Sequence, residues 1–174
     1  MSISELEKRF SDIYNKESDA LFRFCLIRVS DRDRALDITQ EAFTRLWRTF
    51  TSEKVVENPR AFVFVTARNL IIDWYRKTKP LSLEGLSTEE DRPFDIPDEK
   101  QAREIEVSSD ARRALEFVEK LEPQYREVIF LRFVSDLEPR DIAEVLGLNA
   151  NTVSVRLSRG MEALRQLMGI EKIK

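Results

Sequence analysis

The sequence contains no histidine, one cysteine, four glycines and six prolines. A single cysteine excludes an internal disulfide. Without histidine, a cysteine pair, a glycine-rich phosphate loop or a serine nucleophile elbow, catalysis would need carboxylates or lysines alone. We therefore expect no enzyme active site, no metal and no cofactor.

Long hydrophobic runs are missing as well, and the chain does not open on a basic and then apolar leader segment. These absences predict a cytoplasmic protein with no membrane insertion. Cys25 stands among Leu21, Phe24 and Leu26, which favours a buried free thiol over a redox sensor.

Neither sign of charge dominates the chain, since 29 basic and 32 acidic residues give a formal net charge of −3. This average hides a pattern, because residues 84–110 hold ten acidic side chains and only three basic ones. That stretch carries −7 and the remainder of the chain +4. Net charge therefore does not exclude nucleic acid as a partner.

The composition is typical of a helical protein, with 42% hydrophobic and 35% charged residues. Residues 80–107 hold Pro80, Pro93 and Pro97, many acids and no helical apolar stripe, which predicts a flexible acidic linker. It separates helical blocks at residues 1–79 and 108–174. No segment alternates with a two-residue period, so we predict an all-α fold of two small helical domains.

The first block is predicted to contain four helices. The first begins with a Ser4-x-x-Glu7 capping box, and the second runs from about residue 18 to residue 29. A third can start at Ser30. The fourth opens with Asn58-Pro59, because asparagine is a good N-cap and proline is well tolerated at the first helical position.

The second block contains residues 139–153, PRDIAEVLGLNANTV, whose apolar residues have the spacing of a helix-turn-helix. Ala143 is small enough for a close helix crossing, Gly147 permits a left-handed turn, and Asn149 caps the second helix. An ordinary helical hairpin is the alternative. The beginning of the second helix enters the major groove in such motifs, and its outward positions are Asn151, Thr152, Ser154, Val155, Ser158 and Arg159.

Three motifs follow one another along the chain. The first reads DITQEAF at 37–43 and LWR at 46–48; the second reads NPRAF at 58–62, ARN at 67–69 and DWYRK at 73–77. The third reads LEP at 121–123, DIA at 141–143, TV at 152–153 and RL at 156–157. They resemble the polymerase-binding region, the promoter-melting helix and the C-terminal domain of sigma-70 factors. With no room left for further domains, the chain resembles the extracytoplasmic-function (ECF) class.

The resemblance implies a sigma factor that binds core RNA polymerase and promoter DNA and that can have an anti-sigma partner. It implies that the acidic linker threads toward the RNA exit path, whereas composition alone suggests a solvated tether. One helical face would dock on the polymerase, whereas composition alone is also explained by a solvated mixed-charge face. This face consists of Asp37, Gln40, Glu41, Arg45 and Arg48.

The resemblance also implies that the fourth predicted helix and the loop before it read melted minus-ten DNA. A flipped base would enter a pocket formed by residues 51–57 and Asn69, whose amide both donates and accepts. The aromatic residues Phe62, Phe64, Trp74 and Tyr75 fit either base stacking or a hydrophobic core. The implied minus-ten residues are Thr51, Ser52, Glu53, Lys54, Arg68, Asn69, Arg76 and Lys77.

The helix-turn-helix would read the upstream minus-thirty-five element. Three positions depart from the family's usual pattern: Glu138 stands where a serine or threonine cap is common, Ser154 replaces a frequent lysine or arginine, and Gly160 costs a helix about 1 kcal/mol against alanine. These departures leave the upstream sequence open. The implied residues are Asn151, Thr152, Ser154, Val155, Arg156, Ser158 and Arg159.

Three other functions stay open on the sequence alone. One is an enzyme that uses carboxylates or lysines. Another is a helix-turn-helix regulator that binds promoter DNA without acting as a polymerase subunit. The third is a sigma-like protein that has lost initiation and serves only as a binding partner.

Overall fold

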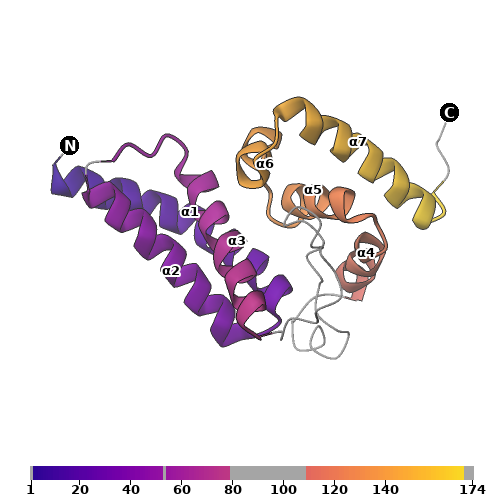
Figure 1. Ribbon diagram of the computed structural model, residues 1–174, viewed down its shortest axis with the longest axis horizontal. Coiled ribbons are helices and arrows are strands. Elements are labelled where there is room, and N and C mark those ends of the chain that lie inside the picture. The colour runs from indigo at the N-terminus through magenta and orange to yellow at the C-terminus, as the bar shows by residue number, and fades with distance from the viewer. Residues whose placement is uncertain (1, 53, 79–108, 171–174) are drawn as a thin grey trace.

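The computed structural model of the protein describes residues 2–52, 54–78 and 109–170. These residues form seven α-helices and no strand, so the predicted all-α fold is confirmed. Figure 1 shows α1 to α3 side by side and α4 to α7 as a second group. The predicted linker at 80–107 lies outside the described residues. Among the helices described, none is long and apolar enough to cross a membrane.

The first helix, α1 (Ile3–Val29), is continuous where the sequence predicted two helices. Residues 14–18 contain neither glycine nor proline, so nothing interrupts the backbone hydrogen bonds there. The predicted capping box at Ser4 and Glu7 is also wrong. Ser2 caps the helix instead: its Oγ accepts from Glu5 N at 3.3 Å, and its own N donates to Glu5 Oε2 at 2.7 Å.

The second helix, α2 (Arg32–Thr51), starts one residue later than the predicted cap would place it. Ser30 ends α1 in a left-handed conformation, with φ 50°, and an N-cap needs extended backbone. Asp31 has that backbone, and its Oδ1 accepts from Arg34 N at 2.9 Å. The first block therefore has three helices.

The third helix, α3 (Pro59–Thr78), begins as predicted. Asn58 Oδ1 accepts from Ala61 N at 3.1 Å, which satisfies one free backbone donor of the first turn. The ring of Phe64 meets that of Phe24 edge-on, with centroids 5.3 Å apart, and both side chains are fully buried. This aromatic pair joins α3 to α1 in the core.

The second group consists of α4 (Ser109–Glu119), α5 (Pro123–Phe133), α6 (Pro139–Leu146) and α7 (Ala150–Leu167). Gly160 lies on the side of α7 that faces α5. A Cβ at this position would stand 3.0 Å from Ile129 Cγ1 and 3.2 Å from Tyr125 Cβ. The close approach of the two helices therefore explains a glycine that helix propensity alone disfavours.

One hydrophobic core cluster spans both groups, and a smaller one around Val118, Leu121 and Ile129 lies within the second group. α6 packs beside α3, and the Phe24 and Phe130 rings lie 6.2 Å apart across the boundary between the groups. The helix-turn-helix therefore lies against the helix whose sequence resembles a promoter-melting helix.

Candidate nucleic-acid interfaces

The proposed polymerase-docking residues lie together on the open side of α2. Asp37, Gln40, Arg45 and Arg48 are exposed and Glu41 is half-buried. The opposite side of α2 is apolar and faces the core. Arg45 Nε donates to Glu41 Oε1 at 2.7 Å, within a pair that is about half exposed on both sides. Such a pair adds little stability, which leaves its charges available to a partner.

The helix-turn-helix has the predicted geometry. Gly147 ends α6 with φ 65°, and Leu148 N donates to Ala143 O at 2.9 Å across the turn. Asn149 then caps α7, accepting from Thr152 N through Oδ1 at 2.7 Å. Val153 is fully buried and fixes which face of α7 points inward.

The outward face of α7 carries most of the predicted upstream-reading residues. Thr152 and Arg156 are half-buried beside it. The exposed members share one side of the first turns of the helix and are Asn151, Ser154, Val155, Ser158 and Arg159. The structure thus brings the predicted set together on one helix.

Glu138 precedes α6 but makes no capping hydrogen bond with its side chain. Its Oε1 instead accepts from Arg132 Nη1 at 3.1 Å, and the same nitrogen donates to Leu137 O at 3.1 Å. Arg132 therefore ties the end of α5 to the start of the helix-turn-helix. The link does not satisfy the free backbone donors of α6, as a serine or threonine cap would, but it fixes where α6 begins relative to α5.

The loop between α2 and α3 presents polar residues to solvent. Thr51, Ser52 and Lys54 are exposed, whereas Glu53 lies outside the described residues. Thr51 Oγ1 donates back to Trp47 O at 3.2 Å, so its hydroxyl is engaged with the end of α2. Asn69 is exposed on α3, as base reading requires.

The predicted cations of α3 have different surroundings. Arg68 Nε donates to Glu127 Oε1 of α5 at 3.1 Å, and both side chains are mostly buried. Arg76 Nη1 lies 3.8 Å from Asp73 Oδ1 on the same helix, and Lys77 is exposed. Arg68 is thus held by the second group of helices in this arrangement.

The aromatic residues of α3 all pack on the core, to different depths. Phe64 belongs to the core, so the core interpretation holds there. Phe62, Trp74 and Tyr75 are half-buried. The Tyr75 hydroxyl donates to the backbone carbonyl of Arg28, which anchors the end of α3 to α1.

Sequence reasoning missed the polar contacts that Asn58 and Arg60 make with α1 and with the second group. Arg60 Nε lies 2.9 Å from Glu17 Oε2 on α1, and Arg60 Nη1 lies 3.9 Å from Asp141 Oδ2 on α6. Asn58 Nδ2 donates to Asp141 Oδ1 at 2.8 Å and to Glu144 Oε2 at 2.7 Å. No pattern in the sequence marks these contacts, because the paired residues lie far apart in the chain. Polar and charged residues of this kind are also typical of solvated helix faces.

A buried arginine was missed as well. Arg28 is 3% exposed, and its guanidinium carbon lies 3.9 Å from the Phe24 ring centroid and 4.1 Å from that of Phe130. Burial lowers the pKa of Arg28 to about 9, against the opposing attraction of Glu127, so the group stays charged at neutral pH. The available signal was a cation inside the apolar run at residues 20–29.

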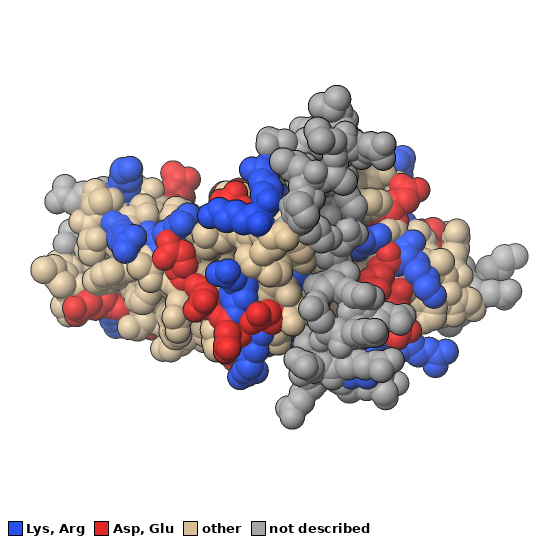
Figure 2. Space-filling model, turned by 60° about the horizontal axis from the view of Figure 1, so that its bottom comes forward, with Lys and Arg blue, Asp and Glu red and all other residues tan. Residues whose placement is uncertain are grey.

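Basic and acidic side chains are interspersed on the face that Figure 2 shows, with no broad patch of one sign. A DNA-binding protein usually presents clustered cations. Part of the explanation is that Arg60 and Arg68 face acids of the second group in this arrangement.

Comparison with known proteins gives matches to both blocks. The family model Sigma-70 region 2 matches residues 13–80, and Sigma-70, region 4 matches residues 111–164. The ECF RNA polymerase sigma factor SigW of Bacillus subtilis is 30% identical over 166 residues, covering 90% of this chain and 87% of SigW. The ECF RNA polymerase sigma factor BldN of Streptomyces coelicolor is 28% identical over 162 residues, covering 91% of this chain and 60% of BldN.

Among solved structures, the chain is similar to the sigma factor RpoE of Bartonella quintana in complex with the anti-sigma factor NepR. The TM-score is 0.61 at 23% identity, over 95% of this chain and 99% of that one. This likeness supports the arrangement of helices described above.

Proposed function

The chain belongs to the sigma-70 family, in its extracytoplasmic-function (ECF) class, and we propose how its residues divide the work of transcription initiation. It is an alternative-type sigma factor that binds core RNA polymerase and directs promoter-specific initiation. It has no catalytic role in the proposal, and it acts in the cytoplasm. The RpoE structure contains an anti-sigma factor, and we propose a partner of that kind here.

Residues 1–79 form the domain that binds polymerase and minus-ten DNA, and residues 108–174 form the domain that binds minus-thirty-five DNA. Polymerase docking is assigned to the exposed face of α2. Its support is the mixture of Asp37, Glu41 and Arg45 on a helix whose other side is buried. Charged rims of this kind set the orientation and the association rate of a complex.

Minus-ten reading is assigned to the loop before α3 and to α3 itself. The support is that Asn69, whose amide can read a base edge, is exposed, as are Lys54 in the loop and Lys77 near the end of α3. Unstacking a base costs a few kcal/mol, and contacts of the correct base recover that cost. For Arg68 to bind a phosphate through Nε it exchanges Glu127 for DNA, so engagement of DNA breaks this contact between α3 and α5.

Minus-thirty-five reading is assigned to α7. The single observation that carries the proposal is the Asn149-capped helix with Val153 buried beneath exposed Ser154 and Arg159, in a chain that also matches the polymerase-binding region. A helix so capped enters the major groove with its first turns.

Co-purification with core polymerase tests the proposal against the runner-up, a helix-turn-helix regulator. The proposal predicts that tagged chain retains core enzyme and that promoter DNA is bound specifically only when core enzyme is present. Specific promoter binding by the chain alone, without retention of core enzyme, would support the regulator.

A further inference from the structure

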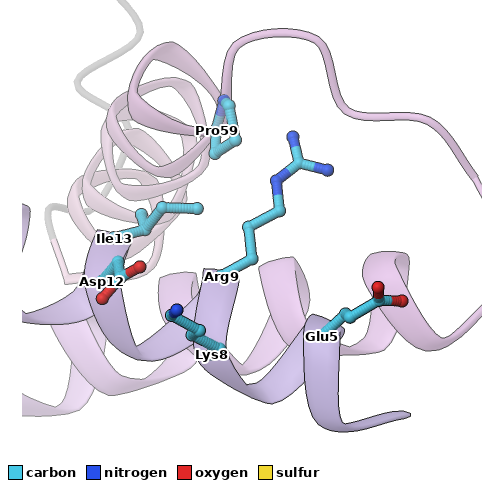
Figure 3. Close-up of a pocket in the computed structure, with 6 residues that line it drawn as sticks. All are labelled: Glu5, Lys8, Arg9, Asp12, Ile13 and Pro59. Atoms are coloured by element: carbon cyan, nitrogen blue, oxygen red, sulfur yellow. The ribbon is translucent and has the colours of Figure 1, made fainter. Parts of the chain in front are cut away.

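Arg9 of α1 reaches a loop that lies 47 residues later in the sequence. Its Nη2 donates to Val56 O at 3.0 Å. Its guanidinium carbon lies 4.9 Å from the centroid of the Phe50 ring, near the end of α2. One side chain thus connects α1, the end of α2 and the loop before α3. Figure 3 shows Arg9 rising from α1 toward that loop.

The loop has few other constraints at this point. Among the described residues, 54–57 make no hydrogen bond other than the one from Arg9. Val56 is 8% exposed and Val55 is 87% exposed. Arg9 therefore bonds to the loop at Val56, whose side chain is buried, directly after Val55, whose side chain is exposed to solvent.

The space beside Arg9 is open, although Val56 itself packs into the core. A pocket of about 470 Å³ lies beside Arg9, lined also by Lys8, Ile13 and Pro59. No residue of 54–57 lines this pocket, so the loop is held here by the Arg9 bond and by the buried Val56 side chain. A hydrogen bond from a charged donor is stronger than a neutral one, which suits a contact that fixes the backbone of a loop whose residues 54–57 make no other hydrogen bond within the described part of the chain.

We propose that Arg9 is a positioning residue for minus-ten recognition: it fixes the loop at Val56 so that Lys54 and Val55 face the unwound strand. The inference rests on the proposed function of the loop. An arginine is required because its planar guanidinium stacks over Phe50 while one edge donates to the carbonyl. Lysine has a point charge without that plane, so it preserves the charge but not both contacts.

The test compares holoenzymes that carry Arg9→Gln, Arg9→Lys or the control Lys8→Gln on a promoter library randomised across the minus-ten element. Lys8→Gln removes the same charge from the adjacent position of α1, where the exposed side chain lines the pocket but does not bond to the loop. Arg9→Gln should change the relative use of bases at one or two minus-ten positions by about five-fold, as one lost hydrogen bond implies. Arg9→Lys should change it less, and Lys8→Gln not at all.

Hydrogen exchange of the Ala61 and Phe62 amides, which bond to Asn58 where the loop enters α3, supplies a second readout. It should speed up most in Arg9→Gln, less in Arg9→Lys and not in Lys8→Gln. An even loss of transcription across the library, or a profile equal to that of Lys8→Gln, would overturn the inference. If Arg9→Gln fails to fold, the Arg9→Lys profile decides, and a profile identical to wild type overturns it. Failure of the wild-type chain to initiate at all would instead overturn the proposed function.

Discussion

Arg60 Nε lies 2.9 Å from Glu17 Oε2, and the Glu17 side chain is only 4% exposed. The pair joins the first turn of α3 to the middle of α1. Arg60 Nη2 also donates to Asp136 O at 2.7 Å, beyond the end of α5. This arginine therefore stabilises the packing of α3 on α1 and the contact between the two domains.

Arg60→Ala should lower the free energy of unfolding by about 3 kcal/mol, because it leaves a buried carboxylate without its partner. The double variant Arg60→Met, Glu17→Gln should recover much of that loss, since it removes both charges. Urea denaturation measures the difference. Arg45→Ala is the matched control: its partner Glu41 is 40% exposed, and the loss there should stay below about 0.5 kcal/mol. Equal losses in the two single variants would contradict the assignment of a buried pair.

Cys25 should be unreactive in the folded protein. The side chain is fully buried, and burial raises the pKa of its thiol to about 12. The folded thiol stays protonated where the unfolded one ionises, so the stability it contributes is full below pH 9 and declines as the pH rises toward 12. Alkylation by iodoacetamide at pH 8 should therefore proceed only after denaturant is added. Rapid labelling of the native protein would favour the redox-sensor alternative.

Reversing charge on the outer face of α2 should separate docking from folding. Asp37→Lys with Glu41→Lys should weaken binding to core polymerase strongly and leave helical content unchanged, because neither side chain faces the core. Binding to immobilised core enzyme and circular dichroism provide the two measurements. Undiminished binding would place the docking surface elsewhere.

Different residues of α7 should read bases and contact phosphates. Ser154→Arg should change the preferred upstream sequence, because a guanidinium can add a guanine contact of roughly 1–3 kcal/mol. Arg159→Ala should weaken use of all promoters and reduce the salt slope by roughly one unit per lost contact. Both side chains are exposed on α7, so neither change disturbs the core. Selection of preferred upstream sequences by each holoenzyme checks the division, and the reverse outcome would invert the assignment of helix faces.

Local chemistry made much of this fold predictable. Asn58, Gly147 and Asn149 interact with residues only a few positions away in the sequence. They form the helix caps and the turn that the sequence indicated. The same kind of signal predicted the wrong N-cap where two neighbouring residues could both cap a helix, as at Ser30 and Asp31. The left-handed end of α1 decided that competition, and it is visible only in three dimensions.

The remaining features depend on packing between distant segments. Gly160 is explained by Ile129, and Arg28 by two rings from different domains. The Arg9 contact with the loop spans 47 residues. A single sequence carries no periodicity or spacing that encodes such pairs, so the connections among α1, α3 and α6 could not be predicted from it.

Run-off transcription with purified core polymerase tests the central claim most directly. Core enzyme alone should give no promoter-specific transcript from a randomised promoter library. Addition of the chain should give transcripts from a subset that shares one minus-ten and one minus-thirty-five sequence. A chain that binds core enzyme but yields no such subset would contradict its role as an initiation factor.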